Sequence, residues 1–274
     1  MAASRTAWHV LLAALLHERA PRRFEVRSEV PLSAEPLRAD YLLLCTVGVA
    51  DVDPPGPAPK RWKLWSLLPK DTLVELKSTG RPYRSRNLNR LWAYLHLYFA
   101  DQPARLASSP DLAGVLLVAA RTPSLDADAQ ALGLTWQDLR GGYWKLVGGP
   151  FTLYVGEIDV VAEAEDDDLL RLFGHAQQHT IEGRRWLSDK VGGKETAMEM
   201  HELEGYDEVI LKLLTSLPPE QRLAGLAPEQ RLAGLAPEQA VLVLSDDMLR
   251  ALSDEYLAKL PAGARAAIRT RIGR

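Results

Sequence analysis

The stretch from Thr72 to Thr79 constrains the fold most, because it predicts a strand that carries two charged side chains on one face. Its apolar and β-branched residues favour a short strand, and a glycine and a proline directly after it end the strand. Residues two apart on a strand point to the same side, so Glu75 and Lys77 are expected to lie next to each other. The apolar residues between and before them then face the core.

A second carboxylate opens an earlier apolar run, in which Asp40 precedes the segment Tyr41 to Cys45. This run also predicts a strand. If the two strands are neighbours, Asp40 and Glu75 form a site for a hard divalent cation with Lys77 beside it. Such a set of side chains is suited to hydrolysis of phosphodiesters.

The remaining patterns predict an α/β fold in which these two strands are part of a larger sheet. The period of the apolar residues and the turn residues between them predict the following order. The expected elements are a helix at 4–19, a strand at 24–30, the Asp40 strand, the Glu75 strand, a helix ending at Phe99, a buried strand at 112–120, and a hairpin of 143–147 with 151–155 whose last strand extends over 158–161.

An acidic residue leading one strand, Glu-x-Lys on the next strand and a helix after it resemble the PD-(D/E)XK nuclease superfamily. The resemblance covers about residues 4–160 and implies a restriction-endonuclease-like αβββαβ core. It implies a DNA endonuclease in which Asp40 and Glu75 hold Mg²⁺ (or Mn²⁺), together with the backbone carbonyl of Leu76. Lys77 would orient the attacking water or stabilise the transition state.

The same resemblance leaves two features of the site open. A further carboxylate would come from Glu18, on the first helix, or from Glu29, on the first strand. On the helix after the Glu75 strand, where related enzymes carry a polar residue near the metal, the nearest candidates are Asn87, Asn89 and Arg90. Relatives that dimerise to cut both strands suggest a homodimer by analogy.

Binding of DNA would need a local basic surface, because the net charge of the chain is −3. The most basic stretch lies directly after the Glu75 strand and contains Arg81, Arg84 and Arg86. These three side chains are therefore candidates for contacts with phosphate groups.

The sequence predicts two parts, a nuclease-like domain at 1–162 and a helical C-terminal extension at 163–274. The extension contains a nine-residue repeat, Pro-Glu-Gln-Arg-Leu-Ala-Gly-Leu-Ala, that starts at Pro219, again at Pro228, and in part at Pro237. The repeat resembles C-terminal tails of bacterial families of recombination-promoting nucleases and transposases. It suggests a link to recombination or mobile elements.

The single cysteine, Cys45, lies in an apolar run and is expected to be a buried thiol in a reducing cytoplasm. No apolar run approaches the length of a membrane span. His9 and His17 are expected at an interface or at the surface. His175 and His179 are four apart, but they lack the glutamate of the HExxH zinc motif and are expected to be surface residues.

Two other functions stay open at this point. The chain could be a catalytically silent interaction protein that uses its helical tail on a nuclease-like scaffold. It could also be an enzyme for a small molecule, which would require a deep apolar pocket.

Overall fold

A computed structural model describes residues 6–31, 38–46, 61–175, 181–193, 200–217 and 245–273. The chain divides into two compact units, residues 1–216 and residues 217–274. This division differs from the predicted boundary after residue 162, because the segment 163–216 belongs with the sheet. The repeat that begins at Pro219 and the proline-rich loop 51–60 lie outside the described residues.

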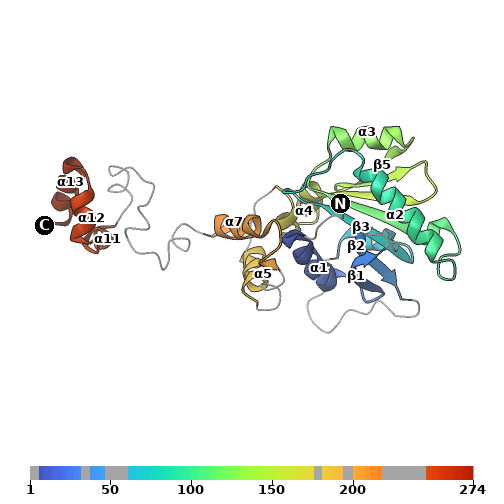
Figure 1. The fold of residues 1–274 in the computed structure, drawn as a ribbon, viewed down its shortest axis with the longest axis horizontal. Helices are drawn as coiled ribbons and strands as arrows, with labels where there is room; N and C mark the ends of the chain where they lie inside the picture. Colours follow the sequence, from blue (N-terminus) through green and yellow to red (C-terminus); the bar gives the residue numbers. More distant parts are fainter. Residues whose placement is uncertain are drawn as a thin grey trace. The chain divides into compact units, whose positions relative to one another are not determined.

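The first unit is built on a seven-stranded mixed sheet in the described part of the chain, with the strand order β1-β2-β3-β4-β7-β6-β5 (Figure 1). The strands are β1 (Phe24–Pro31), β2 (Arg38–Cys45), β3 (Asp71–Lys77), β4 (Leu112–Val118), β5 (Thr135–Arg140), β6 (Tyr143–Val147) and β7 (Thr152–Glu157). β3, β4 and β7 run parallel to one another, and the outer pairs are antiparallel. The predicted α/β class is confirmed.

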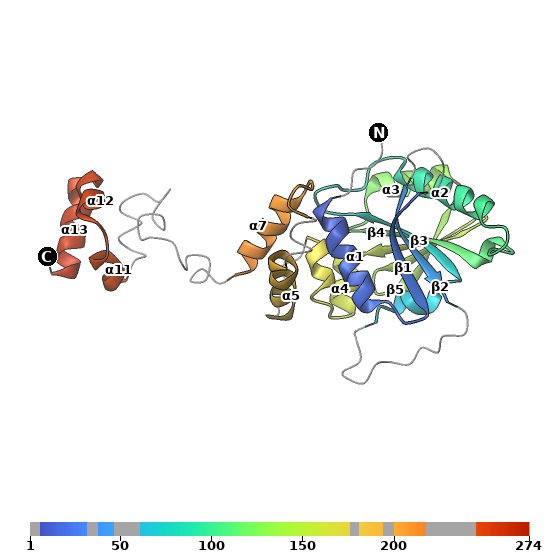
Figure 2. The ribbon, with the colours of Figure 1, turned by 60° about the horizontal axis from the view of Figure 1, so that its bottom comes forward.

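Helices cover both faces of this sheet (Figure 2). Helix α1 (Ala7–Arg19) packs on the face formed by Val74 and Leu76 of β3, whereas α2 (Asn87–Asp101) packs on the face that contains Leu73. The opposite orientation of neighbouring β3 residues confirms the alternation predicted from the sequence. The elements follow one another as helix, three antiparallel strands, helix and parallel strand.

Residues 158–161 were expected to extend a strand, and this prediction is wrong. They belong to helix α4 (Ile158–Ala164), which begins directly after β7. The backbone N–H of Asp159 still donates to the carbonyl of Ala119, 3.2 Å away, which continues the register of β4 with β7 into the first turn of this helix. The sequence also did not predict α3 (Pro123–Ala131) or β5, whose hydrophobic patterns are weak.

Three helical segments of residues 163–216 pack over α1. They are the 3₁₀ helix η3 (Leu170–Phe173) and the helices α5 (Ile181–Gly192) and α7 (Tyr206–Ser216). The ring of Phe173 meets Trp8 edge to face at 5.9 Å between centroids, and the N–H of Ala7 donates to the carbonyl of Glu204 at 2.9 Å. Because α1 is apolar on most of its surface, these segments supply the burial that it needs.

The second unit contains the helices α11 (Asp246–Arg250), α12 (Asp254–Lys259) and α13 (Ala262–Ile272). Its small core consists of Leu249, Leu252 and Ile268. Ser245 and Ser253 cap α11 and α12, since their side chains accept hydrogen bonds from backbone N–H groups in the first turn. Helices in this region were predicted. Among the described residues, no helix has the length and apolar character needed to cross a bilayer.

Candidate functional site

The end of β3 brings Asp40 next to Glu75. β2 and β3 are antiparallel, and Tyr41 pairs with Val74 at the end of their ladder. One residue further along both strands, the same alignment sets Asp40 opposite Glu75. At this position a side chain, and not the backbone, links the two strands. The Oδ2 of Asp40 accepts a hydrogen bond from the backbone N–H of Leu76 at 2.9 Å.

Lys77 contacts Glu75 directly, as the strand period predicts. The Nζ of Lys77 lies 2.6 Å from the Oε1 of Glu75, and the two side chains are 13% and 5% exposed. The second carboxylate oxygen, Oε2, is buried and has no hydrogen-bond partner among the residues that the structure describes. A buried carboxylate oxygen without a partner is costly, so this atom is available to a cation or a proton.

His9, in the first turn of α1, reaches the same site. Its Nε2 lies 3.4 Å from the Oδ2 of Asp40. The other ring nitrogen, Nδ1, accepts the backbone N–H of Thr6 at 3.1 Å and lies 2.7 Å from the Thr6 hydroxyl. Because Nδ1 is an acceptor in this contact, the neutral ring carries its proton on Nε2, toward Asp40. The sequence placed His9 at an interface or at the surface, and the structure sets it beside the predicted acid.

The two carboxyl groups differ in their protonation. Burial, and then the nearby charge of Asp40, raises the pKa of Glu75 to about 7, although Lys77 and His9 act in the opposite direction. Burial acts to raise the pKa of Asp40 as well. It is outweighed by the hydrogen bond and charge of His9, the charge of Lys77 and the Leu76 N–H, which together hold that pKa below its usual value. Asp40 is therefore the anion of the pair, and Glu75 exchanges its proton near neutral pH.

Tyr94 closes the site from α2. It is buried, and burial together with the charges of Glu75 and Asp40 raises its pKa to about 12. Its phenol thus stays protonated beside the carboxylates. Helix periodicity predicts that Tyr94 faces the core, but it gives no sign that this core face meets the strand end.

The predicted phosphate-binding arginines have different surroundings. The Nε of Arg81 donates to Glu204 at 2.9 Å, so this side chain is paired with a carboxylate. Arg84 and Arg86 are exposed and form no ion pair within the described ranges. Arg86 has a left-handed backbone, with φ of 71°, directly before α2. Of the three predicted arginines, Arg84 and Arg86 are those available to an anion.

The position of Glu18 argues against a role in this site. Glu18 lies near the other end of α1, where it accepts hydrogen bonds from Trp186 at 2.7 Å and from Lys190 at 2.6 Å. The side chain of Glu29, the other candidate, lies outside the described part of the structure. Within the described residues, no group of three or more histidine, cysteine, aspartate and glutamate side chains is arranged to hold a metal ion.

Asp40, Glu75 and Lys77 thus meet at one strand end, as predicted, and His9 and Tyr94 join them from the two flanking helices. The arrangement can hold a proton or a cation on Glu75, next to a fixed anion and a fixed ammonium group. Comparison of the chain with protein-family models, with curated proteins and with solved structures returned no match.

Proposed function

We propose that this chain is a metal-dependent DNA endonuclease with a core of the PD-(D/E)XK type. The observation that supports this best is the Glu75 carboxylate. It is buried, lies beside Asp40, contacts Lys77 through one oxygen and leaves the other without a partner among the described residues. A divalent cation would satisfy that oxygen and would stabilise two neighbouring negative charges.

In this proposal Asp40 and Glu75 would hold the cation, with the carbonyl of Leu76 as a further oxygen ligand. Such a cation would lower the pKa of an attacking water and would neutralise charge on the phosphate. Lys77 places a positive charge where the phosphate gains negative charge. His9 orients the carboxylate of Asp40. Arg84 and Arg86 contact phosphates further along the DNA strand.

The proximity of His9 bears on the choice of metal. Both of its ring nitrogens are engaged, Nδ1 by Thr6 and Nε2 by Asp40, so the ring would not itself bind the cation. Two carboxylates and a carbonyl are oxygen ligands that suit Mg²⁺ and also Mn²⁺, and we expect either ion to support the reaction.

The contact between Lys77 and Glu75 also suits a second function. In a catalytically silent scaffold, this ion pair would stabilise the strand end, and Lys77 would take the place of a cation. A nuclease and a silent scaffold differ in what happens when a metal is added.

The test is cleavage of supercoiled DNA by the purified protein with Mg²⁺, Mn²⁺ or EDTA, combined with metal binding by calorimetry. Cleavage should require the metal and should fall by about a hundredfold or more in Lys77→Met and Asp40→Asn. Lys145→Met is the control, since this lysine lies on β6, and its cleavage should equal that of the unmodified protein. A folded protein that binds no metal and leaves DNA intact would instead support the silent scaffold.

A further inference from the structure

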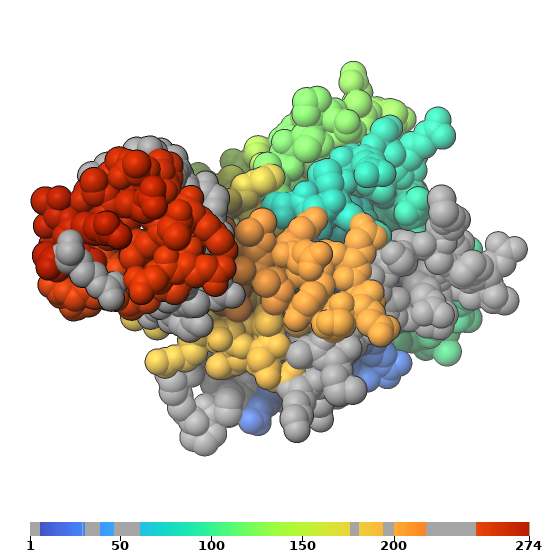
Figure 3. All heavy atoms as spheres, turned by 60° about the vertical axis from the view of Figure 1, so that its left-hand side comes forward, coloured from blue at the N-terminus to red at the C-terminus, as the bar shows by residue number. Residues whose placement is uncertain are grey.

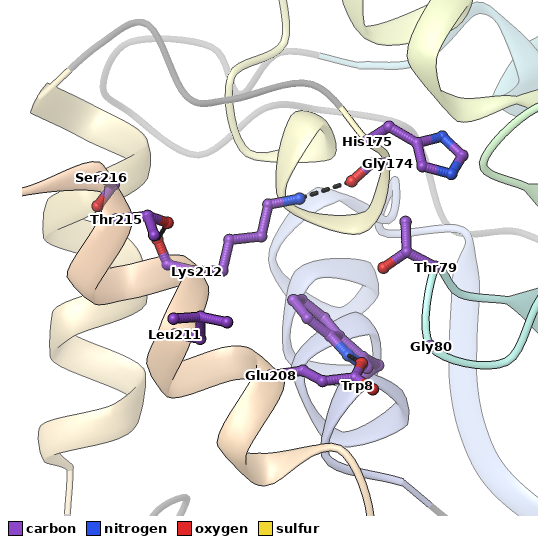
Figure 4. Close-up of a pocket in the computed structure, with 10 residues that line it drawn as sticks. All are labelled: Trp8, Thr79, Gly80, Gly174, His175, Glu208, Leu211, Lys212, Thr215 and Ser216. Carbon is purple, nitrogen blue, oxygen red and sulfur yellow. Dashed lines mark hydrogen bonds between the residues drawn. The ribbon is translucent and has the colours of Figure 1, made fainter.

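A separate cavity of about 440 Å³ lies between α7 and the first turn of α1. The residues of α7, orange in Figure 3, form part of the surface of the first unit here. The lining residues are shown in Figure 4: Trp8, Thr79, Gly80, Gly174, His175, Glu208, Leu211, Lys212, Thr215 and Ser216. Asp40, Glu75 and Lys77 are not among them.

Lys212 extends from α7 across this cavity toward Gly174 (Figure 4). Its Nζ donates to the carbonyl of Gly174 at 2.6 Å and to the carbonyl of Arg171 at 3.1 Å. It also lies 5.8 Å from the centre of the Trp8 ring. These two carbonyls hold the nitrogen beside the cavity, and a neutral amine, which has two hydrogens, can keep both contacts.

Burial favours the neutral form of Lys212, whereas the two carbonyls and the Trp8 ring suit its ammonium form. Burial lowers the pKa of Lys212 to about 8, and the charge of Asp159 on α4 opposes this change only in part. Near neutral pH, a larger share of this amine is therefore neutral than of an ordinary exposed lysine. Lysines in apolar pockets act as nucleophiles toward carbonyl compounds for this reason.

The charges around the cavity disfavour an anionic ligand. Glu208, on the same helix as Lys212, accepts a hydrogen bond from the Nε1 of Trp8 at 3.0 Å. Asp159 accepts the backbone N–H of His175 at 2.7 Å and lies 2.8 Å from its Nδ1. Of these two carboxylates, Glu208 lines the cavity, and Asp159 lies next to it through its contact with His175. A ligand without charge avoids the repulsion that a phosphate or carboxylate would meet.

We propose that this cavity binds a small, uncharged aldehyde or ketone and that Lys212 forms an imine with its carbonyl carbon. The C–N bond forms when the Nζ lone pair attacks that carbon. The carbonyl oxygen then leaves as water with the two hydrogens of the amine, and a C=N bond remains. The step needs no oxidant or reductant. His175, whose ring contacts Asp159 and is 65% exposed, lines the same cavity at its open side.

The experiment traps the imine with sodium cyanoborohydride in the presence of EDTA. The full chain is incubated with benzaldehyde over a range of concentrations, and modified lysines are identified by peptide mass spectrometry. Lys212 should react at least about tenfold faster at pH 7.5 than Lys259, whose side chain is 70% exposed. Its rate should saturate with the aldehyde concentration, whereas that of Lys259 should rise linearly.

Two substitutions on α7 test whether the cavity is needed. Leu211 lines the cavity and is 61% exposed, so Leu211→Trp fills space without disturbing the core and should reduce modification of Lys212 at least fivefold. Leu214 is 44% exposed and does not line the cavity, so Leu214→Trp should leave the rate unchanged. Equal rates for Lys212 and Lys259, or a Lys212 rate that does not saturate, would overturn the proposal. EDTA and the Lys77→Met variant separate this result from DNA cleavage, because neither should alter the imine.

Discussion

The Glu75 carboxyl keeps its proton to a higher pH than an ordinary glutamate, because burial and the neighbouring Asp40 both disfavour its charged form. Its pKa of about 7 in the folded protein lies above the value near 4.5 expected in the unfolded chain. The folded state therefore binds more protons than the unfolded state between these two values. The resulting stability is present below about pH 4.5 and is lost as the pH rises through 7.

We predict that Glu75→Gln removes this part of the pH dependence. In EDTA, the free energy of unfolding of the unmodified first unit should fall by up to about 3 kcal/mol between pH 4.5 and 8 because of Glu75 alone. The glutamine variant should show a correspondingly smaller fall. Urea denaturation at several pH values measures both. Glu182→Gln, at an exposed position of α5, should retain the full dependence, and parallel curves for the protein and Glu75→Gln would contradict the prediction.

Residue positions along a single strand could be predicted from the sequence, whereas contacts between distant elements could not. Glu75 and Lys77 share a face because the strand period is two, whatever surrounds them. The contact of His9 with Asp40 depends on where the first turn of α1 meets the end of β2, which local pattern does not determine. The pairing of Arg81 with Glu204 could not be predicted for the same reason, since the two residues are far apart in sequence.

Among the elements, α3 anchors the arginine-rich segment through one buried carboxylate. Asp128 is 7% exposed, and it accepts hydrogen bonds from the hydroxyl of Tyr83 and the backbone N–H of Arg86, both at 2.5 Å. The left-handed backbone of Arg86 is held in this way. The segment that presents Arg84 and Arg86 is thus fixed by a helix that the sequence did not predict.

We predict that Asp128→Ala destabilises the first unit by about 2–3 kcal/mol, since the buried hydroxyl of Tyr83 and the partly buried N–H of Arg86 lose their acceptor. Urea denaturation measures this change. Asp126, on the same helix, is 45% exposed and pairs with Arg121 at the surface, so Asp126→Ala should cost less than about 1 kcal/mol. Equal effects of the two substitutions would show that Asp128 does not anchor the segment.

Substitution of the exposed arginines should weaken DNA binding through charge alone. Arg84→Ala and Arg86→Ala should each reduce the slope of log affinity against log salt by about 1, and the loss should be similar for different DNA sequences. Fluorescence anisotropy with a labelled duplex in Ca²⁺ measures the slope. Arg81→Ala should change it less, because Glu204 already pairs with Arg81. An unchanged slope in all three variants would exclude this segment as a phosphate-binding surface.

Patterns predicted the central elements better than the peripheral ones. The strands around β3 and β4 are long apolar runs, and their positions follow from composition and turn residues. Residues 158–161 carry the same apolar character but form α4, in which Ile158, Val161 and Ala162 are buried at helical spacing. A short apolar run does not distinguish a strand from a buried helix turn.

For the whole molecule, the packing of residues 163–216 on α1 predicts where the chain can be shortened. A chain that ends at residue 216 should retain the melting temperature of the first unit, because the boundary between the two compact units lies after this residue. A chain that ends at residue 162 loses Phe173, Leu187 and Val209 from the core around Trp8. It should be unfolded or strongly destabilised, at about 1.5–3 kcal/mol for each large side chain lost. Calorimetry of both variants checks this, and a cooperative transition in the shorter chain would contradict it.

The packing of α1 under α7 also has a consequence during synthesis on the ribosome. Val209 is made about 200 residues after Trp8, which lies in the same core, and at about 5–20 residues per second this interval is on the order of 10–40 s. For that time the apolar surface of α1 lacks its permanent cover, although β1 to β4 are already available. The nascent chain therefore completes this core only when the residues of α7 leave the exit tunnel.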